Sequence, residues 1–562
     1  MRAQPPAARR VRSTIGTLTA RSGAPNDRSR RSATAPAVDR DDPWVGARPR
    51  VAHIAVALCV LMAVAGALDL VEALRRPLWL DEASTFWITT QGWSALLHQS
   101  GTEGSPPFYF LIVKTFISIF GTGELAIRLP SILAAVGLIP LVYVLGRVIH
   151  GMRTGLIAAG LVTISPLVHY YSSEARNYAV VDVETTAVAL VGLYAAAEPR
   201  RWRWWGLLFV VEAIALWTHI YAAFVLPCVP IVCIVATSSE LRTQTALRAT
   251  AVTCGAFLVC LPWLRLSMEA GAAGVGDWIQ VLWTELPPWA ALFRSVAVFS
   301  FGAAYPSYLW SLAQAPNIGW AAFAITVAIL AGGIIGTRRE ISRDRVTAVA
   351  LLGVLPLTAA WIYSLMFHPL YIPGRYDMIV LPFFFAVFAT GMDVVWRWRR
   401  LAGVAVAVVV GALAVRTLTS SFDQSNLPSF LHLDPAAGRT LGRVAAPGDV
   451  VIATSLRQQV ASYYAMRSGF TGVFRTFPSE VNSHRGWTSP ERMLANPERL
   501  QRDATAVTGD LVRAAHQGHR VWLLPSPPDG VNEFLYRTLL EQMEPAPELI
   551  FKDAGVVGLK MR

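Results

Sequence analysis

Long apolar runs separated by short polar segments dominate the chain from residue 51 to about residue 416. A membrane-spanning helix needs roughly 20 mostly apolar residues, and runs of about that length recur throughout this part of the sequence. The pattern therefore predicts a polytopic α-helical membrane protein. The predicted spans are 51–72, 129–147, 154–171, 178–197, 205–220, 221–237, 249–266, 318–337, 346–366, 377–395 and 401–416.

Basic residues between the runs indicate how the chain crosses the membrane. With the N-terminus in the cytoplasm and eleven spans, the clusters "RRWRW" (200–204), "RREISRDR" (338–345) and "RWRR" (397–400) all fall on the cytoplasmic side. Cytoplasmic loops carry the excess of Lys and Arg. The stretch 205–237 can also be interpreted as one long helix, but this would place the last two clusters outside. The charge bias favours two short helices.

The first external loop is expected to be long, covering residues 73–128. Its segment 105–120 is apolar enough for a span, but counting it as one would reverse the side of every later loop. Lys114 at its middle and a pair of prolines at its start are better suited to a helix lying in the membrane interface. A second long external loop is predicted at 267–317.

The two ends of the chain differ in composition from the predicted membrane domain, 51–417. Residues 1–50 hold eleven Arg against four Asp and are rich in Pro, Ala and Ser, which predicts a disordered cytoplasmic segment. Residues 418–562 have the composition of a soluble domain, and strands alternating with helices indicate a small α/β fold. After an odd number of spans, that domain lies outside the cytoplasm. Its clearest elements are strands at 448–455 and 519–526 and helices at 499–516 and 532–543.

The overall composition agrees with the membrane class. The chain is 54% hydrophobic and only 15% charged, whereas soluble domains are about 25% charged. The net charge of +12 is concentrated in the N-terminal segment and the predicted cytoplasmic loops, so no nucleic-acid partner is expected. Neither a P-loop nor a G-x-G-x-x-G motif occurs, so nothing in the sequence provides an ATP-driven motor.

Two adjacent acids, Asp81 and Glu82 in "PLWLDEAST", follow the first span on its external side. One interpretation is that they only mark the end of a hydrophobic stretch. The other is catalytic: apolar and aromatic neighbours raise the basicity of a carboxylate, which could then accept a proton from a hydroxyl nucleophile.

Two further external turns contain arginines on the side where Arg is scarce. Arg176 lies in "SPLVHYYSSEARNYA" (165–179) and Arg375 in "FHPLYIPGRYD" (367–377). Each could form an ordinary interfacial contact with acids and aromatics, or could bind a phosphate through its planar guanidinium. A divalent metal is left unassigned, because no H-x-x-x-H or similar ligand spacing occurs. The remaining candidates for substrate contact are Glu174, Tyr178, His219 and Tyr376.

These motifs, in this order, resemble the GT-C glycosyltransferases. The resemblance is to the branch of the protein O-mannosyltransferases (family 39) and the lipid A aminoarabinose transferases, and it covers about 77–395. It rests on "LWLDE", "SPPFYFLIVKTFISIFGTGELAIRLPS" (105–131), "SPLVHYYSSEARNYA", "THIYAAF" (218–224) and "IPGRYDMIVLP" (372–382).

The resemblance implies a polyprenyl-phosphate-linked sugar as donor and inverting transfer on the outer face of the membrane. It assigns Asp81 as catalytic base and Glu82 as the second acid of the motif, with Arg176 and Arg375 near the donor phosphate. The C-terminal domain does not resemble the sugar-binding module of the eukaryotic enzymes, so the acceptor is expected only to be an envelope glycan, lipid or protein.

Lysine makes up only three of the 49 basic residues (114, 552 and 560). This bias towards Arg is expected of a high-GC bacterium, and the plasma membrane is the expected location. Related enzymes of actinobacteria build envelope glycans that contain mannose or arabinose, so the resemblance implies one of these as the donor sugar. Two rival hypotheses remain: a non-catalytic polyprenyl-lipid transporter or flippase, and a receptor that binds glycans through its external domain.

Overall fold

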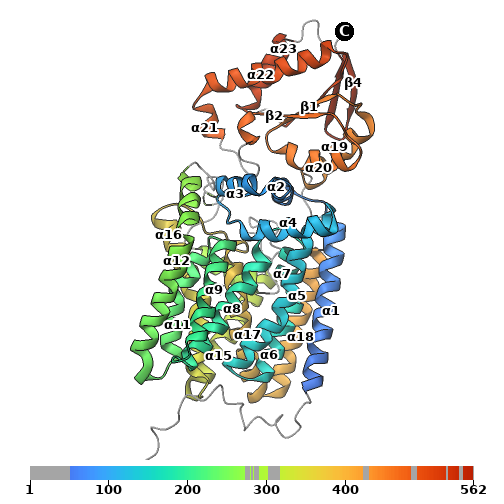
Figure 1. Ribbon diagram of the computed structural model, residues 1–562. Helices are drawn as coiled ribbons and strands as arrows, with labels where there is room; N and C mark the ends of the chain where they lie inside the picture. The colour runs from blue at the N-terminus through green and yellow to red at the C-terminus, as the bar shows by residue number, and fades with distance from the viewer. Residues whose placement is uncertain are drawn as a thin grey trace, which may run out of the picture.

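The protein consists of a long helical bundle with a small α/β unit at one end (Figure 1). The computed structural model describes residues 51–272, 279, 283, 290–300, 317–421, 430–482, 490–526, 529–542 and 548–560. The segment 1–50, which the sequence predicts to be disordered, lies outside these residues, as does much of the predicted loop 267–317.

Each of the eleven predicted spans is helical in the described part of the chain. Among the described residues, eight helices are long and apolar enough to cross a membrane, and a ninth span results if one bent pair is counted as a single crossing. The helices of the bundle, shorter ones included, are α1 (Val51–Arg75), α5 (Glu124–Ile149), α6 (Met152–Thr163), α7 (Pro166–Ser172), α8 (Tyr178–Ala197), α9 (Trp202–Thr218), α10 (Ala222–Val225), α11 (Val229–Ala236), α12 (Arg242–Ala272), α15 (Asn317–Gly336), α16 (Arg343–Met366), α17 (Leu381–Trp398) and α18 (Arg400–Ser421).

The predicted span 154–171 is not one continuous helix, which corrects the sequence interpretation. The chain bends by 58° between α6 and α7. Ser165 is the N-cap of α7, its hydroxyl accepting a hydrogen bond from the main-chain N–H of Val168 at 3.3 Å, and Pro166 follows it. Serine at the N-cap and proline at the first helical position are a strong start signal. Here they begin a new helix inside an apolar run.

The stretch 205–237 forms two antiparallel helices, which confirms the prediction from the charge bias. At the end of α9 the Thr218 hydroxyl donates to Glu184, near the start of α8, at 2.7 Å. After α11 the Thr237 hydroxyl donates to the Ala196 carbonyl, near the end of α8, at 3.1 Å. α9 therefore runs antiparallel to α8, and the segment from α10 to α11 runs back in the direction of α8.

Three short helices of the loop 73–128, which the sequence predicts to be external, cover one end of the bundle: α2 (Leu80–Thr89), α3 (Trp93–Thr102) and α4 (Phe108–Phe120). Figure 1 shows α4 lying across the bundle rather than along it, as expected for the predicted interfacial helix. Lys114 of α4 donates to the carbonyls of Thr89 and Gln91 at 3.0 and 2.5 Å. It thus caps the end of α2.

The C-terminal unit is built on a mixed sheet of five strands in the order β2-β1-β3-β5-β4. β1 is parallel to β2 and β3, whereas β5 is antiparallel to β3 and β4. β1 and β3 confirm the two predicted strands, and α22 and α23 the two predicted helices. The elements are α19 (Phe430–Val444), β1 (Val450–Thr454), α20 (Arg457–Arg467), β2 (Val473–Phe477), α21 (Pro490–Leu494), α22 (Pro497–His516), β3 (Val521–Leu524), α23 (Asn532–Gln542), β4 (Glu548–Asp553) and β5 (Val556–Lys560).

Candidate active site

The two acids of "PLWLDEAST" lie in the first turn of α2, directly after the N-cap residue Trp79. Successive residues of an α-helix point about 100° apart, because the helix has 3.6 residues per turn. Asp81 and Glu82 therefore face different surroundings, and the contacts of the two carboxylates are entirely separate.

Glu82 is fully buried and forms a two-pronged ion pair with Arg128 of α5. Arg128 Nε lies 2.6 Å from one carboxylate oxygen and Nη2 lies 2.7 Å from the other. The first oxygen also accepts a hydrogen bond from the Ala175 main-chain N–H at 2.9 Å. The other N–H groups of Arg128 donate to the carbonyls of Ala73, Arg76 and Pro77. The ion pair and its hydrogen bonds thus link α1, α2, α5 and the turn after α7.

Sequence reasoning missed Arg128, although it lies inside a quoted motif, "GELAIRLPS". A signal was present: the residue directly precedes a predicted span on the external side, where Arg is scarce. The same sidedness criterion singled out Arg176 and Arg375. It was not applied to Arg128.

Asp81 faces a different direction, towards two arginines from distant parts of the chain. Its carboxylate lies 2.5 Å from Nη2 of Arg375 and 3.9 Å from Nε of Arg176, and its side chain is 14% exposed. Arg375 Nε also donates to the Tyr178 hydroxyl at 2.8 Å. An aspartate at the start of α2 thus meets a turn before α8 and a turn before α17. Two positive charges face one negative charge.

The turn that carries Arg375 is held in place by main-chain contacts. Gly374 has a φ of +75°, a conformation that glycine adopts without steric cost. Its carbonyl accepts a hydrogen bond from the Tyr171 hydroxyl at 2.5 Å. Earlier in the same segment, Ser364 accepts hydrogen bonds from the main-chain N–H groups of Leu370 and Tyr371. The guanidinium is therefore presented from a constrained loop.

Glu174 lies beside this group, in the turn between α7 and α8, and is only 1% exposed. Within the described residues, neither of its carboxylate oxygens accepts a hydrogen bond, and Nε of Arg176 likewise donates none. Burial raises the pKa of Glu174 to about 7, although Arg375 and Arg76 oppose the shift. Buried polar atoms are normally paired, so these groups are suited to contact a ligand.

An aromatic wall borders the arginines. The ring of His219 lies 5.6 Å from that of Tyr178 and 5.8 Å from that of Tyr376, and the rings of Tyr376 and Tyr221 are 4.7 Å apart. His219 Nδ1 accepts a hydrogen bond from the Tyr221 main-chain N–H at 3.1 Å. The guanidinium of Arg375 lies within 6 Å of the rings of Trp79, Tyr178 and Tyr376, close enough for cation–π attraction.

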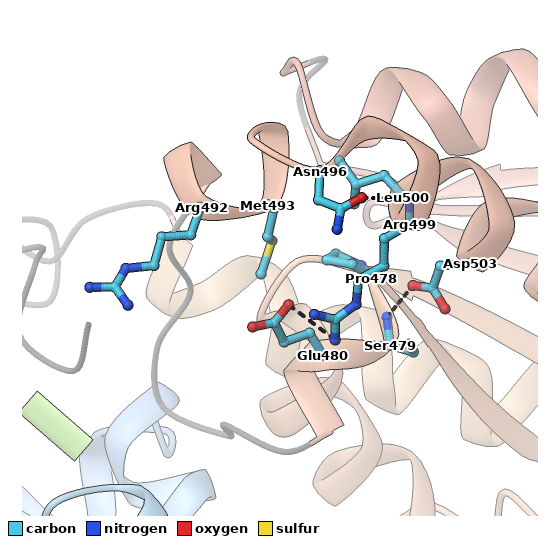
Figure 2. A pocket seen from close by; sticks show the side chains of 9 residues that line it. All are labelled: Pro478, Ser479, Glu480, Arg492, Met493, Asn496, Arg499, Leu500 and Asp503. Carbon is cyan, nitrogen blue, oxygen red and sulfur yellow. Dashed lines mark hydrogen bonds and ion pairs between the residues drawn. The ribbon is translucent and has the colours of Figure 1, made fainter. Parts of the chain in front are cut away.

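The structure thus brings together seven of the eight predicted site residues and sets Glu82 apart from them. No group of three or more His, Cys, Asp or Glu side chains suited to a metal ion occurs in the described residues. The separate surface pocket in Figure 2 belongs to the C-terminal unit, where Arg499 lies 3.6 Å from Glu480 and Asp503 accepts from the Ser479 N–H. It contains none of the predicted site residues.

Known proteins with the same architecture agree with the resemblance drawn from the motifs. The family described as dolichyl-phosphate-mannose-protein mannosyltransferase matches residues 104–265. No curated protein matches the sequence.

Two of the similar solved structures are of ArnT from Cupriavidus metallidurans. The form bound to undecaprenyl phosphate is 14% identical with a TM-score of 0.54, and covers 91% of this chain and 98% of its own. The apo form is 13% identical with a TM-score of 0.54, covering 90% and 97%. The Archaeoglobus fulgidus oligosaccharyltransferase tethered to an acceptor peptide is 12% identical with a TM-score of 0.50, covering 78% and 65%.

The fold is therefore that of the ArnT structures, and the family match over residues 104–265 agrees with the resemblance to the GT-C glycosyltransferase superfamily. Within that superfamily, the chain resembles the branch of the protein mannosyltransferases and ArnT.

Proposed function

We propose that this protein is a glycosyltransferase that moves a sugar from a polyprenyl-phosphate donor to a hydroxyl of a cell-envelope acceptor. The observation that carries the proposal is the placement of Asp81 between Arg375 and Arg176, at 2.5 and 3.9 Å. A base and two phosphate-binding cations are the groups that such a transfer requires. They come from three separate turns at one end of the bundle.

The two arginines are suited to the phosphate of the donor. Guanidinium groups bind phosphate in a two-pronged geometry, and Nε of Arg176 donates no hydrogen bond within the described residues. A phosphate bound here would compete with Asp81 for Arg375. Binding of the donor would therefore release the carboxylate for catalysis, while the aromatic wall formed by Tyr178, His219 and Tyr376 would contact the sugar or the lipid.

Asp81 would act as the general base. The acceptor hydroxyl attacks the anomeric carbon and gives its proton to Asp81 as the new C–O bond forms. The bond between the anomeric carbon and the phosphate oxygen breaks, and the phosphate leaves with the electron pair. Arg176 and Arg375 stabilise the charge that develops on it. Attack opposite the leaving group inverts the anomeric configuration.

Glu82 was predicted as a second catalytic acid, and we revise this role. Its two oxygens are occupied by Arg128 and by the Ala175 N–H, and its side chain is 0% exposed. We propose that Glu82 positions α2 and the turn of Arg176 and makes no contact with substrate. Glu174, whose oxygens have no hydrogen-bond partner among the described residues, is the better candidate for a second acid in contact with the substrate.

The donor class is supported by the names of the similar proteins: one family is named for dolichyl-phosphate-mannose, and one ArnT structure holds undecaprenyl phosphate. We further propose that the N-terminus is cytoplasmic and that the site and the C-terminal unit face outwards across a bacterial plasma membrane. Mannose or arabinose is the proposed sugar, and an envelope glycan, lipid or protein the proposed acceptor.

The proposal is tested by incubating membranes that contain the protein with labelled polyprenyl-phosphate mannose or arabinose. We expect label to reach an acceptor with the wild type and to fall by about 10²–10⁴-fold with Asp81→Asn, at equal amounts of folded protein. Full activity of that variant would refute the role of Asp81. Movement of labelled lipid across the membrane without transfer would instead favour the transporter hypothesis.

A further inference from the structure

The helix that carries Asp81 is in direct contact with a helix of the C-terminal unit. Figure 1 shows α20 next to α2, at the junction between the unit and the bundle. The Tyr464 hydroxyl accepts a hydrogen bond from the main-chain N–H of Leu78 at 2.8 Å. Leu78 lies three residues before Asp81, and both Leu78 and Tyr464 are buried.

A second set of contacts lies further along α2. The ring of Tyr463 meets that of Phe86 edge to face, with centroids 4.9 Å apart. Trp87 Nε1 donates to the Gln459 carbonyl at 2.9 Å. Both units contribute to one hydrophobic cluster, in which Val460, Tyr463 and Tyr464 pack with Leu78 and Phe86. The contact between the two units is thus apolar, buried and continuous.

α20 also reaches the turn between α4 and α5. The Tyr463 hydroxyl and Arg467 Nη1 both donate to the Thr122 carbonyl, at 3.1 and 3.2 Å. This turn leads into α5, which carries Arg128 and thereby holds Glu82. One helix of the C-terminal unit therefore contacts both α2 and the entry to the helix to which α2 is bound.

Close packing within the C-terminal unit fixes the orientation of α20. Gly438 of α19 approaches it so closely that an added Cβ would lie 2.3 Å from the Ala461 carbonyl oxygen. Ala461 and Ala465 are buried in a cluster with Ala437 and Leu441 of α19. Movement of the unit is therefore expected to be transmitted to α2 rather than absorbed within α20.

We propose that α20 holds the catalytic helix in position, with Tyr464 as a positioning residue for Asp81; this rests on the proposed function. Leu78 lies one residue before Trp79, the N-cap of α2, so its buried N–H has no partner within the helix and needs one from elsewhere. Tyr464 supplies one from outside. Without its hydroxyl, a buried N–H loses its partner and the segment that aims Asp81 at Arg375 loosens. Catalytic groups must be held within about 0.5 Å of the productive geometry.

The test compares Tyr464→Phe with wild type by hydrogen–deuterium exchange of the purified full-length protein. The expected result is exchange about five-fold faster in peptides covering 78–90, from the loss of one hydrogen bond. Tyr536→Phe is the matched control, because that hydroxyl donates to the Ser526 carbonyl within the C-terminal unit. Unchanged exchange at 78–90 in Tyr464→Phe, or an equal change in the control, would overturn the proposal.

The functional readout separates positioning from substrate binding. Transfer should fall about ten-fold in Tyr464→Phe, while the Kd for undecaprenyl phosphate stays within about two-fold of wild type, because the arginines are untouched. A weakened Kd, or full transfer by a variant with faster exchange, would contradict a role through Asp81. If wild type transfers no sugar, the proposed function fails, whereas the exchange experiment still decides whether α20 holds α2.

Discussion

The regions around Glu82 and Asp81 begin from the same chemistry and differ in what surrounds it. Both residues are carboxylates in the first turn of α2, and both face arginine. Around Glu82, burial is complete and both carboxylate oxygens accept hydrogen bonds. Around Asp81, the carboxylate is partly exposed and lies near two arginines. Beside it, the Glu174 oxygens and Nε of Arg176 form no hydrogen bond within the described residues. The contacts of Glu82 stabilise the fold, whereas groups beside Asp81 can still form hydrogen bonds with a ligand.

The largest effect is expected from Glu82→Gln, which removes the buried counter-ion of Arg128 and leaves it with the more distant Glu124 at 3.9 Å. Removing one partner of a buried ion pair costs about 3–5 kcal/mol. The variant should therefore show a strongly reduced melting temperature in detergent and a low yield of folded protein. An additional Arg128→Met substitution should recover part of that stability, because no isolated charge remains. Normal stability of Glu82→Gln would remove the distinction between the two regions.

The next effect concerns Glu174 and the dependence of stability on pH. Its pKa is raised from 4.5 to about 7 by burial, so the folded protein holds a proton that the unfolded chain releases between these values. Stability therefore falls as pH rises from about 4.5 to 7, by about 3 kcal/mol in total. Melting temperatures from pH 5 to pH 8 should show this decline in wild type and a smaller one in Glu174→Gln. Equal slopes would contradict the assignment.

A smaller effect is expected from Arg375→Lys, which keeps the charge but not the planar guanidinium. Lysine cannot donate from one planar group to both Tyr178 and Asp81, as Arg375 does at 2.8 and 2.5 Å. Binding of undecaprenyl phosphate should weaken about ten-fold, measured with purified protein. Lys114→Arg is a useful control, because Lys114 caps α2 away from the arginines. Equal affinity in wild type and Arg375→Lys would remove Arg375 from the proposed phosphate site.

The smallest effect on stability is expected from Asp81→Asn. Asparagine keeps an acceptor oxygen for Arg375, and the carboxylate of Asp81 is 14% exposed rather than fully buried, so the melting temperature should fall less than in Glu82→Gln. Binding of undecaprenyl phosphate should tighten about five-fold, since Arg375 is no longer engaged by a carboxylate. A variant that loses transfer but binds lipid phosphate better would sharpen the contrast with Glu82→Gln. Weaker binding would contradict the competition proposed for Arg375.

Most of the candidate site could be predicted from the sequence, because its arginines lie where the positive-inside rule predicts few basic residues. Arg176 and Arg375 stand out on a side of the membrane where Arg is scarce, and Asp81 follows the first apolar run. Such signals depend on the position of a residue relative to the predicted spans and not on how the helices pack. They could not show which of two adjacent acids meets Arg128, because that pair joins residues 46 positions apart.

The sequence by itself determined the helical segments and the antiparallel pair within 205–237, because apolar length and the distribution of charge are local properties. Apolar length did not reveal the 58° break between α6 and α7. The signal there was the pair Ser165 and Pro166, which starts α7 inside a run that remains apolar. β4 is largely exposed, and its apolar run is only three residues long, Leu549 to Phe551. Tertiary structure alone decided that α20 lies on α2 and that Asp81 faces Arg375 and Arg176 whereas Glu82 faces Arg128. Those outcomes depend on how distant surfaces pack, which no local pattern encodes.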